Sequence, residues 1–240
     1  EVNIYSARKE ALIKPLLDKF TEQTGIEVNL VTGKADALLK RLESEGRNSP
    51  ADILLTVDAG RLHRAKELGV IQPIDSATLK AAIPASYREP DGYWWGLSLR
   101  ARPIMYVKGK VDPAELSTYE ALTDSKWKGR ICISSSSNIY NQSLVAGMLA
   151  TQGAEATAAW LQKFVRNFAR PPAGGDRDQI KAVAAGQCDI AVVNSYYLCA
   201  MVNSPEASER AAAARVDIFW PNQADRGTHI NVSGAGITAS

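Results

Sequence analysis

Apolar and polar residues in the first part of the chain follow a pattern that switches repeatedly between strand and helix. The pattern predicts short apolar strands at residues 2–5, 26–31 and 53–55, and helices at residues 10–24, 35–42 and 58–69. Gly25 and Gly69 stand where helices end, and Asp58 stands where an N-cap residue begins one. Because alternating strands and helices assemble into parallel sheets with covering helices, we expect an α/β fold.

The middle of the chain breaks this rhythm. Residues 93–107 form a long extended stretch with Arg100 and Arg102 at alternate positions, which favours a strand passing between two lobes over an interior strand. After it the alternation resumes. It predicts helices at about 113–122, from 140, at 154–168, 176–185 and from 195, and strands at 130–133, 189–193 and 216–220. An apolar segment at 230–238 finishes the chain.

This order of elements predicts two α/β lobes joined by crossing strands. We expect residues 1–99 to form the first lobe and residues 100–224 the second, with hinge strands near 98–107 and 216–230. Residues 225–240 are expected to return to the first lobe. Ligands of such sheets bind beyond the carboxyl ends of the strands, so we expect the ligand in the interlobe cleft.

Composition excludes several classes of protein. With 28 basic and 26 acidic side chains, a net charge of +2 and 45% hydrophobic residues, the chain is neither disordered nor basic enough to grip nucleic acid or an anionic membrane. No apolar run approaches the roughly 20 residues that cross a bilayer, so a soluble protein is expected. The chain begins at Glu1 without Met or a signal peptide, either because a leader has been removed or because the sequence starts there.

The cysteines leave two alternatives open. Cys132 and Cys188 lie in apolar segments that predict strands, and two neighbouring strands could hold them close enough for a disulfide, which implies an oxidising compartment. The alternative is two buried free thiols. Cys199 is predicted to be a small core residue of a helix, and His63 to lie on a solvated helix face. Without a CxxC motif or a Cys/His cluster, no zinc site is expected.

Two short motifs suggest enzymes but lack the context that the chemistry needs. Tyr5 and Lys9 have the spacing of the tyrosine and lysine of short-chain dehydrogenases, yet Tyr5 ends a strand and no GxGxxG turn follows. Ser6 and Lys9 match the nucleophile motif of penicillin-binding enzymes, whose partner motifs are absent. We therefore expect no catalysis, and a tyrosine/lysine oxidoreductase is the least favoured function.

A stronger candidate site lies at two strand-to-helix turns. Tyr196 and Tyr197 follow the strand at 189–193, and Tyr140 begins a helix after the Ser-rich turn at 134–138. Adjacent tyrosines in a first helical turn diverge by about 100°, so both rings cannot bury in one core face. One core ring and one surface ring is the ordinary interpretation of such a pair. Unpaired N–H groups and hydroxyls at the turn before Tyr140 would favour an anion.

Three phenols and an anion site suit one kind of ligand. A phenolate is a hard, anionic oxygen donor, which matches Fe(III) better than Cu(I) or Zn(II). Free tyrosine has a pKa near about 10, so its deprotonation at neutral pH needs the positive charge of the metal. Three phenolates neutralise Fe(III), and a small anion held by an arginine or a water molecule would complete its coordination.

Several stretches spread over nearly the whole chain carry a family resemblance. They lie at 4–8, 49–58, 100–102, 137–141, 174–179, 194–197 and 227–234. In these stretches the sequence resembles the periplasmic ferric-iron-binding proteins, or bacterial transferrins, which are the solute receptors of Fe(III) ABC transporters. The resemblance implies a type II periplasmic-binding-protein fold, a periplasmic monomer, and delivery of Fe(III) to an ABC permease. Some members also carry a cysteine pair at the positions of Cys132 and Cys188.

The resemblance also implies roles for individual residues. Tyr140, Tyr196 and Tyr197 match the tyrosine ligands of the family, and Arg100 matches the arginine that holds a synergistic carbonate or bicarbonate. Arg8 is expected to assist Arg100.

Two more residues, Ser137 and Asn194, stand near the family's anion pocket. Arg8 or Arg100 could instead form an ordinary interlobe ion pair.

Departures from the family pattern narrow the expected ligand set. Lys9 stands where some members have a histidine ligand, Glu10 where others have a fourth tyrosine, and Val57 where some have a glutamate. The resemblance is thus to the subgroup whose ligands come mainly from the second lobe, with Glu10 as an optional carboxylate on closure. The chain stops at Ser240, whereas members of the family usually continue with further helices.

One alternative function shares the expected fold. A receptor for a small anion without metal would use Arg8, Arg100 and the turn at 134–138, and calorimetry with anions and Fe(III) would separate it from an iron receptor.

Overall fold

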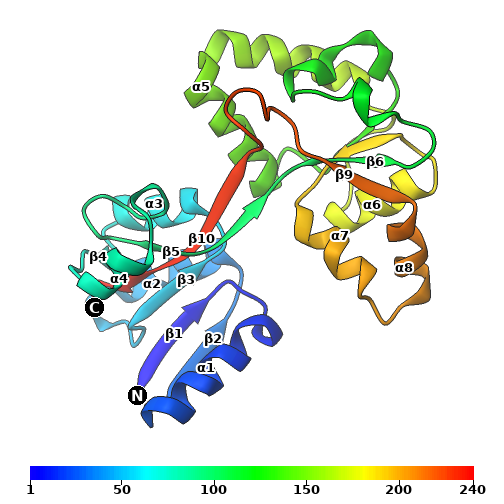
Figure 1. Ribbon diagram of the computed structural model, residues 1–240. Helices are drawn as coiled ribbons and strands as arrows, with labels where there is room; N and C mark the ends of the chain where they lie inside the picture. Colours follow the sequence, from blue (N-terminus) through cyan, green and yellow to red (C-terminus); the bar gives the residue numbers. More distant parts are fainter. The chain divides into compact units, whose positions relative to one another are not determined.

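A computed structural model describes residues 1–240, and the chain divides into two compact units (Figure 1). Glu1–Leu99 and Asn231–Ser240 form the first unit, and Arg100–Ile230 forms the second. The chain therefore passes between the units twice, along β5 (Trp95–Ala101) and at the start of β10 (Ile230–Thr238). The predicted α/β fold with two lobes is confirmed.

The first unit is built on a six-stranded mixed sheet in the order β2-β1-β3-β10-β4, with β5 paired to β10. Its other strands are β1 (Val2–Ser6), β2 (Val28–Thr32), β3 (Ile53–Thr56) and β4 (Ile71–Gln72). β1 lies parallel to β2 and β3, whereas β10 runs antiparallel to β3 and β4. The three strand–helix units predicted at the start of the chain thus supply the parallel half of the sheet.

Helices pack on both faces of this sheet, because side chains alternate along β1. Ile4 packs against Ile13 on one face, and Tyr5 packs with Leu39 on the other. The helices are α1 (Glu10–Thr24), α2 (Ala35–Glu45), α3 (Ala59–Glu67) and α4 (Ala77–Ala82). Asp58 caps α3 as predicted, since its side chain accepts a hydrogen bond from the backbone N–H of Gly60.

The second unit has a four-stranded sheet in the order β7-β8-β6-β9. The strands are β6 (Ile104–Val107), β7 (Ile131–Cys132), β8 (Ile190–Val192) and β9 (Val216–Phe219). β7 and β8 are parallel neighbours, and β6 is antiparallel to β8 and β9. The helices are α5 (Ile139–Phe164), α6 (Asp176–Ala184), α7 (Ser195–Val202) and α8 (Ala207–Ala214). One buried cluster forms the core of this unit.

The predicted helix at 113–122 is wrong. Only two short 3-10 turns form there, Pro113–Glu115 and Glu120–Thr123. Between them the backbone bonds elsewhere: the carbonyl of Ser117 accepts from the N–H of Asn222, and the N–H of Tyr119 donates to the side chain of Asn222. A distant asparagine thus takes the hydrogen bonds that a helix would use. The other 3-10 turns are Gly46–Asn48, Ala85–Tyr87, Ser125–Trp127 and Val165–Asn167.

The two helices predicted from 140 and at 154–168 are both present, because the element α5 consists of two helices separated by the non-helical residue Gly153 (φ 82°, ψ 171°), and the second ends at Phe164. One boundary differs from the sequence-based expectations. Residues 225–230 belong to the second unit, so the return to the first begins at Asn231 rather than at 225. The turn there is held by Asn222 and Arg226, which both bond the Glu120 carboxylate.

The structure of the second unit shows which cysteines form a disulfide and which one is free. Cys132 and Cys188 form a disulfide with a Cα–Cα distance of 5.8 Å, so the alternative of two free thiols is wrong. Cys199 lies in α7 as predicted, but its side chain is exposed and not part of the core. His63 is exposed on α3, as expected. None of the helices combines the length and the apolar character needed to cross a membrane.

Candidate metal centre

Tyr140 stands in the first turn of α5, which begins directly after the Ser-rich turn that follows β7. Asn138 caps the helix, because its side chain accepts from the backbone N–H of Tyr140 at 2.9 Å. Asn141 fastens the preceding turn by donating to the carbonyls of Ser134 and Ser135 at 2.9 and 3.1 Å. The position of Tyr140 is therefore fixed from both sides by local hydrogen bonds.

Tyr196 and Tyr197 occupy the first turn of α7, directly after β8. Their ring centroids are 4.3 Å apart with a tilt of 31°. Tyr197 is half-buried against the core of the second unit, whereas Tyr196 keeps 41% of its surface exposed. Tyr197 is therefore the more buried ring and Tyr196 the more exposed one, in agreement with the ordinary interpretation of such a pair.

The hydroxyl groups of the two helices converge. The Tyr140 and Tyr196 oxygens lie 3.3 Å apart. The reason is the parallel pairing of β7 with β8, in which Ile131 lies opposite Ile190. Parallel neighbours end at the same edge of a sheet, so the helices that follow them begin side by side. The structure therefore brings together the three tyrosines that the sequence singled out.

Crowding of these phenols affects their protonation. Burial raises the pKa of Tyr196 far above its ordinary value, and the neighbouring Tyr140 raises it further. Burial likewise raises the pKa of Tyr197, to about 12. At neutral pH the Tyr196 and Tyr197 phenols are therefore neutral, and a cation that binds them as phenolates must displace their protons.

Two arginines lie over the Tyr140 ring. The guanidinium carbon of Arg100 is 5.3 Å from the ring centroid, and that of Arg102 is 5.8 Å away. Distances of this size allow cation–π attraction. The two side chains differ in burial, since Arg100 is partly exposed and Arg102 is 1% exposed. Arg100 can therefore present its guanidinium to a ligand from solvent, whereas Arg102 faces protein groups.

Arg102 and Asp176 are residues of this centre to which sequence reasoning assigned no role. Arg102 donates to Asp176 at 2.9 Å, to Asn194 at 3.0 Å and to Asn141 at 2.6 Å. The only signal in the sequence was the place of Arg102, two residues after Arg100 on the extended stretch. Its partners lie 39 to 92 positions away, so no local pattern could indicate them.

The other residues expected to bind an anion are spread over both units. Asn194 is buried at the N-cap of α7, and its Nδ2 donor has no acceptor among the protein groups. Ser137 is exposed on the turn before α5, with its hydroxyl 3.0 Å from that of Ser135. Arg8 belongs to the first unit, where its guanidinium donates to Ser98 at 2.9 Å.

Carboxylate, histidine and cysteine side chains make no competing centre. No group of three or more of them is placed to hold a metal ion. Lys9 and Glu10, which replace ligands of some family members, are both exposed. Tyr5 donates to Glu45 at 3.0 Å and is stacked under Arg41, which gives it a structural role in place of the dehydrogenase motif.

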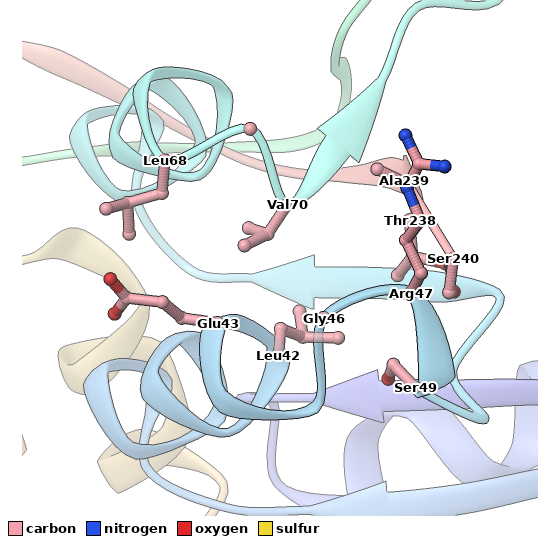
Figure 2. Close-up of a pocket in the computed structure, with 11 residues that line it drawn as sticks. Leu42, Glu43, Gly46, Arg47, Ser49, Leu68, Val70, Thr238, Ala239 and Ser240 are labelled. Carbon is pink, nitrogen blue, oxygen red and sulfur yellow. Dashed lines mark hydrogen bonds between the residues drawn. The ribbon is translucent and has the colours of Figure 1, made fainter.

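Two cavities of the chain are lined by residues other than the three tyrosines. One of about 260 Å³ lies in the first unit (Figure 2) between the end of α2 near Leu42, the turn before β4 at Val70, and the residues that follow β10. Another, of about 650 Å³, is a largely apolar groove along α5 in the second unit, next to the Ser-rich turn. None of the three tyrosines lines either cavity.

Comparison with protein families decides the family of this chain. Residues 48–240 match the family of bacterial extracellular solute-binding proteins. The chain belongs to this family.

Similar members of this solute-binding family bear the names of iron proteins. The chain is 54% identical to Iron uptake protein A1 of Synechocystis sp., over 99% of the chain and 66% of that protein. It is 33% identical to the Fe(3+)-binding periplasmic protein of Serratia marcescens, over 99% of the chain and 68% of that protein. The chain thus spans about two thirds of the length of these relatives. Neither of these two relatives has the name of an enzyme, in line with the expectation that the chain has no catalytic activity.

A solved structure agrees with these names. The Trichodesmium protein IdiA (FutA), in complex with iron and citrate, matches with a TM-score of 0.95 and 54% identity, over 99% of the chain and 75% of that structure. The resemblance of this solute-binding protein to the ferric-iron-binding proteins, stated above from the sequence, is confirmed.

Proposed function

We propose that this solute-binding protein binds Fe(III) through the phenolates of Tyr140, Tyr196 and Tyr197. The observation that carries the proposal is the convergence of phenols from two helices, with the Tyr140 and Tyr196 oxygens 3.3 Å apart. Hydroxyl groups this close suit two ligands of one small cation. The names of the relatives, iron uptake and Fe(3+)-binding proteins, support the same metal.

The chemistry of these donors supports Fe(III) over other cations. Phenolate oxygens are hard and anionic, and three of them offset the charge of a trivalent ion. Softer or divalent metals would gain less from displacing the protons of phenols whose pKa is raised. The three phenolates therefore favour a cation that is both highly charged and hard.

An exogenous anion would complete the coordination. Arg100, stacked over Tyr140 and partly exposed, is the residue that we propose holds carbonate or bicarbonate. The buried amide donor of Asn194 and the exposed hydroxyl of Ser137 are proposed to add hydrogen bonds, and Arg8 to assist from the first unit. Citrate, present with iron in the Trichodesmium relative, is the competing anion.

Location and partner are part of the same proposal. A family of extracellular solute-binding proteins implies a cognate transporter, and we propose delivery of the iron to an ABC permease by a monomeric periplasmic protein. The Cys132–Cys188 disulfide supports an oxidising compartment. The near-neutral composition supports neither a nucleic-acid nor a membrane partner.

The test is the visible charge-transfer band of iron-bound phenolate. Protein loaded with Fe(III) in bicarbonate should be coloured, and replacing Tyr196 and Tyr197 together by Phe should abolish the band, while Tyr106→Phe on β6 should leave it unchanged. Absence of a band from the unsubstituted protein, or its survival in the double variant, would refute the proposal.

A second set of measurements addresses the anion. Loading in bicarbonate, in citrate and in a buffer free of both should give bands of different wavelength or intensity, and Arg100→Met should weaken the dependence on bicarbonate. Calorimetry with the same anions in the absence of iron separates an iron receptor from an anion receptor. Binding of an anion alone, with no uptake of Fe(III), would favour the latter.

A further inference from the structure

Arg102 joins the N-terminal ends of three helices of the second unit. Its guanidinium donates to Asn141 in the first turn of α5, to Asp176 at the first residue of α6, and to Asn194 at the N-cap of α7. The three distances run from 2.6 to 3.0 Å, and the Arg102 side chain is 2% exposed. The helices α5 and α7 carry the tyrosines, and α6 supplies the negatively charged Asp176 that pairs with Arg102.

The Asp176 carboxylate completes this junction. One of its oxygens accepts both from Arg102 at 2.9 Å and from the backbone N–H of Asn194 at 2.8 Å. Both charges are almost fully buried, and buried charges persist only when they are paired and hydrogen-bonded. A planar guanidinium presents its N–H donors in fixed directions, whereas the three donors of an ammonium group lie on one nitrogen at the end of a flexible stem. The spread of the three acceptors around Arg102 therefore suits a guanidinium.

The side chains of Asn194 and Asn141 are committed to this junction. An asparagine at an N-cap ordinarily accepts from a backbone N–H of its own helix, but Asn194 makes no such bond and accepts from Arg102 instead. Asn141 accepts from Arg102 while its amide donates to the turn at Ser134. Both helix starts are thus fixed by one side chain rather than by their own local caps alone.

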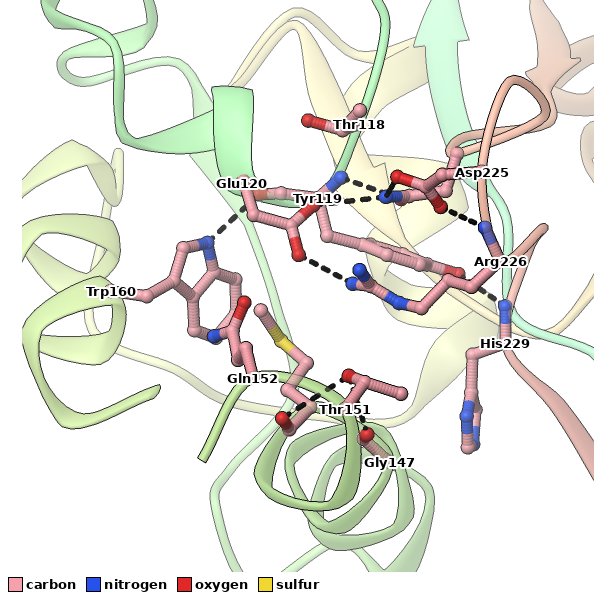
Figure 3. Close-up of polar contacts among 12 residues, drawn as sticks. Thr118, Tyr119, Glu120, Gly147, Thr151, Gln152, Trp160, Asp225, Arg226 and His229 are labelled. Carbon is pink, nitrogen blue, oxygen red and sulfur yellow. Dashed lines mark hydrogen bonds and ion pairs between the residues drawn. The ribbon is translucent and has the colours of Figure 1, made fainter. Parts of the chain in front are cut away.

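The backbone of Arg102 is also held on both sides. Its N–H donates to the carbonyl of His229 at 3.0 Å, and its carbonyl accepts from the hydroxyl of Tyr119 at 2.7 Å (Figure 3 shows Tyr119 and His229). The guanidinium lies 5.8 Å from the ring centroid of Tyr140. Arg102, which directly follows β5, is thus held through its backbone while its guanidinium lies over the Tyr140 ring.

We propose that Arg102 is a positioning residue for the iron ligands, a role that rests on the proposed function of the tyrosines. It holds the first turn of α5 and the first turn of α7 at a fixed separation, which sets the spacing of the Tyr140 and Tyr196 oxygens. Arg102 touches neither the metal nor the anion, in contrast to the role proposed for Arg100. Losing the junction should therefore change the geometry of the bound iron while leaving the ligand set intact.

The experiment compares two variants with the unsubstituted protein. Arg102→Lys keeps the positive charge opposite Asp176 but loses the planar guanidinium. The double variant Arg102→Met with Asp176→Asn removes both buried charges, so that neither is left unpaired. Arg130→Met, which breaks the ion pair with Asp189 at the opposite end of β8, is the matched control. Folding is checked by near-ultraviolet circular dichroism, and iron binding by competition with citrate and by the charge-transfer band.

Both Arg102 variants should fold, bind Fe(III) at least about ten-fold more weakly, and show a shifted or weakened band, while Arg130→Met keeps the band and affinity of the unsubstituted protein. One folded Arg102 variant is enough to test whether Arg102 positions the iron ligands. A folded variant with an unchanged band and an affinity within two-fold would overturn the proposal, as would loss of folding in both variants, since Arg102 would then be a structural residue only. Absence of a band from the unsubstituted protein would refute the proposed function itself, which keeps the two failures apart.

Discussion

At the scale of single residues, the candidate centre is defined by phenols that hold their protons tightly. Burial raises the pKa of Tyr196 and Tyr197, that of Tyr197 to about 12. Below these values the phenols are protonated, so each one that binds Fe(III) as phenolate must release a proton. Proton release and iron binding are therefore linked, and the affinity must fall as the pH falls.

This linkage predicts a proton count. Loading with Fe(III) at neutral pH should release protons that include about two from Tyr196 and Tyr197, and Tyr197→Phe should release about one fewer than the unsubstituted protein. The protons of these two phenols alone should lower the apparent affinity by about 100-fold for each unit that the pH is lowered. A pH-stat titration with a weak Fe(III) chelate, corrected for the protons of the chelate, measures the count.

The control for this titration is Tyr106→Phe, which should release as many protons as the unsubstituted protein. An unchanged count in Tyr197→Phe would show that this phenol does not bind the metal as phenolate.

Residues of the centre differed in how far the sequence could reveal them. Tyr140, Tyr196 and Tyr197 were predicted because each lies at the start of a helix after a strand, a local pattern that places side chains at a sheet edge. Arg102 was given no role, because its contacts bring together segments far apart in the sequence. The role expected for its neighbour Arg100 came from the family resemblance rather than from a local pattern.

At the scale of elements, the parallel pair β7 and β8 determines where the tyrosine helices begin. The Cys132–Cys188 disulfide fastens this pair, since Cys132 ends β7 and Cys188 lies just before β8. Its two cysteines are 56 positions apart, a separation for which the loss of chain entropy in the unfolded state corresponds to about 4 kcal/mol.

The disulfide should therefore contribute strongly to the stability of the second unit. Replacing Cys132 and Cys188 together by Ala should lower the free energy of unfolding by about 2–4 kcal/mol, measured by urea denaturation followed by circular dichroism. Cys199→Ala, at an exposed free cysteine, should change it by less than about 0.5 kcal/mol. A double variant as stable as Cys199→Ala would contradict this account.

Most elements could be predicted from periodicity, and the failures have identifiable causes. The helix α1 was predicted with its observed bounds, because its apolar spacing ends at Gly25, which adopts the left-handed conformation that glycine favours. The helix predicted at 113–122 is absent because Asn222, about a hundred positions away, takes its backbone hydrogen bonds. Periodicity carries no information on such distant partners.

At the scale of the whole molecule, the two segments of the second unit that adjoin the crossings of the chain are joined through the Tyr119 side chain. Tyr119 is almost fully buried, its hydroxyl donates to the carbonyl of Arg102 at 2.7 Å, and its oxygen accepts from the N–H of His229 at 3.1 Å (Figure 3). Burial raises the pKa of Tyr119, so the hydroxyl keeps its proton and remains a donor beyond pH 10. The Trp160 indole holds the backbone of Tyr119 from the other side.

Tyr119→Phe tests this connection, because it removes the hydroxyl while keeping the ring. Two buried or half-buried backbone groups, the Arg102 carbonyl and the His229 N–H, lose a partner, so the free energy of unfolding should fall by about 1–3 kcal/mol. Tyr106→Phe, on the strand that follows the first passage, should cost less than about 0.5 kcal/mol. Urea denaturation of both variants measures the difference. Equal losses would mean that the direct bond from the Arg102 N–H to the His229 carbonyl suffices to join these two segments of the second unit, and that the hydroxyl of Tyr119 adds nothing to it.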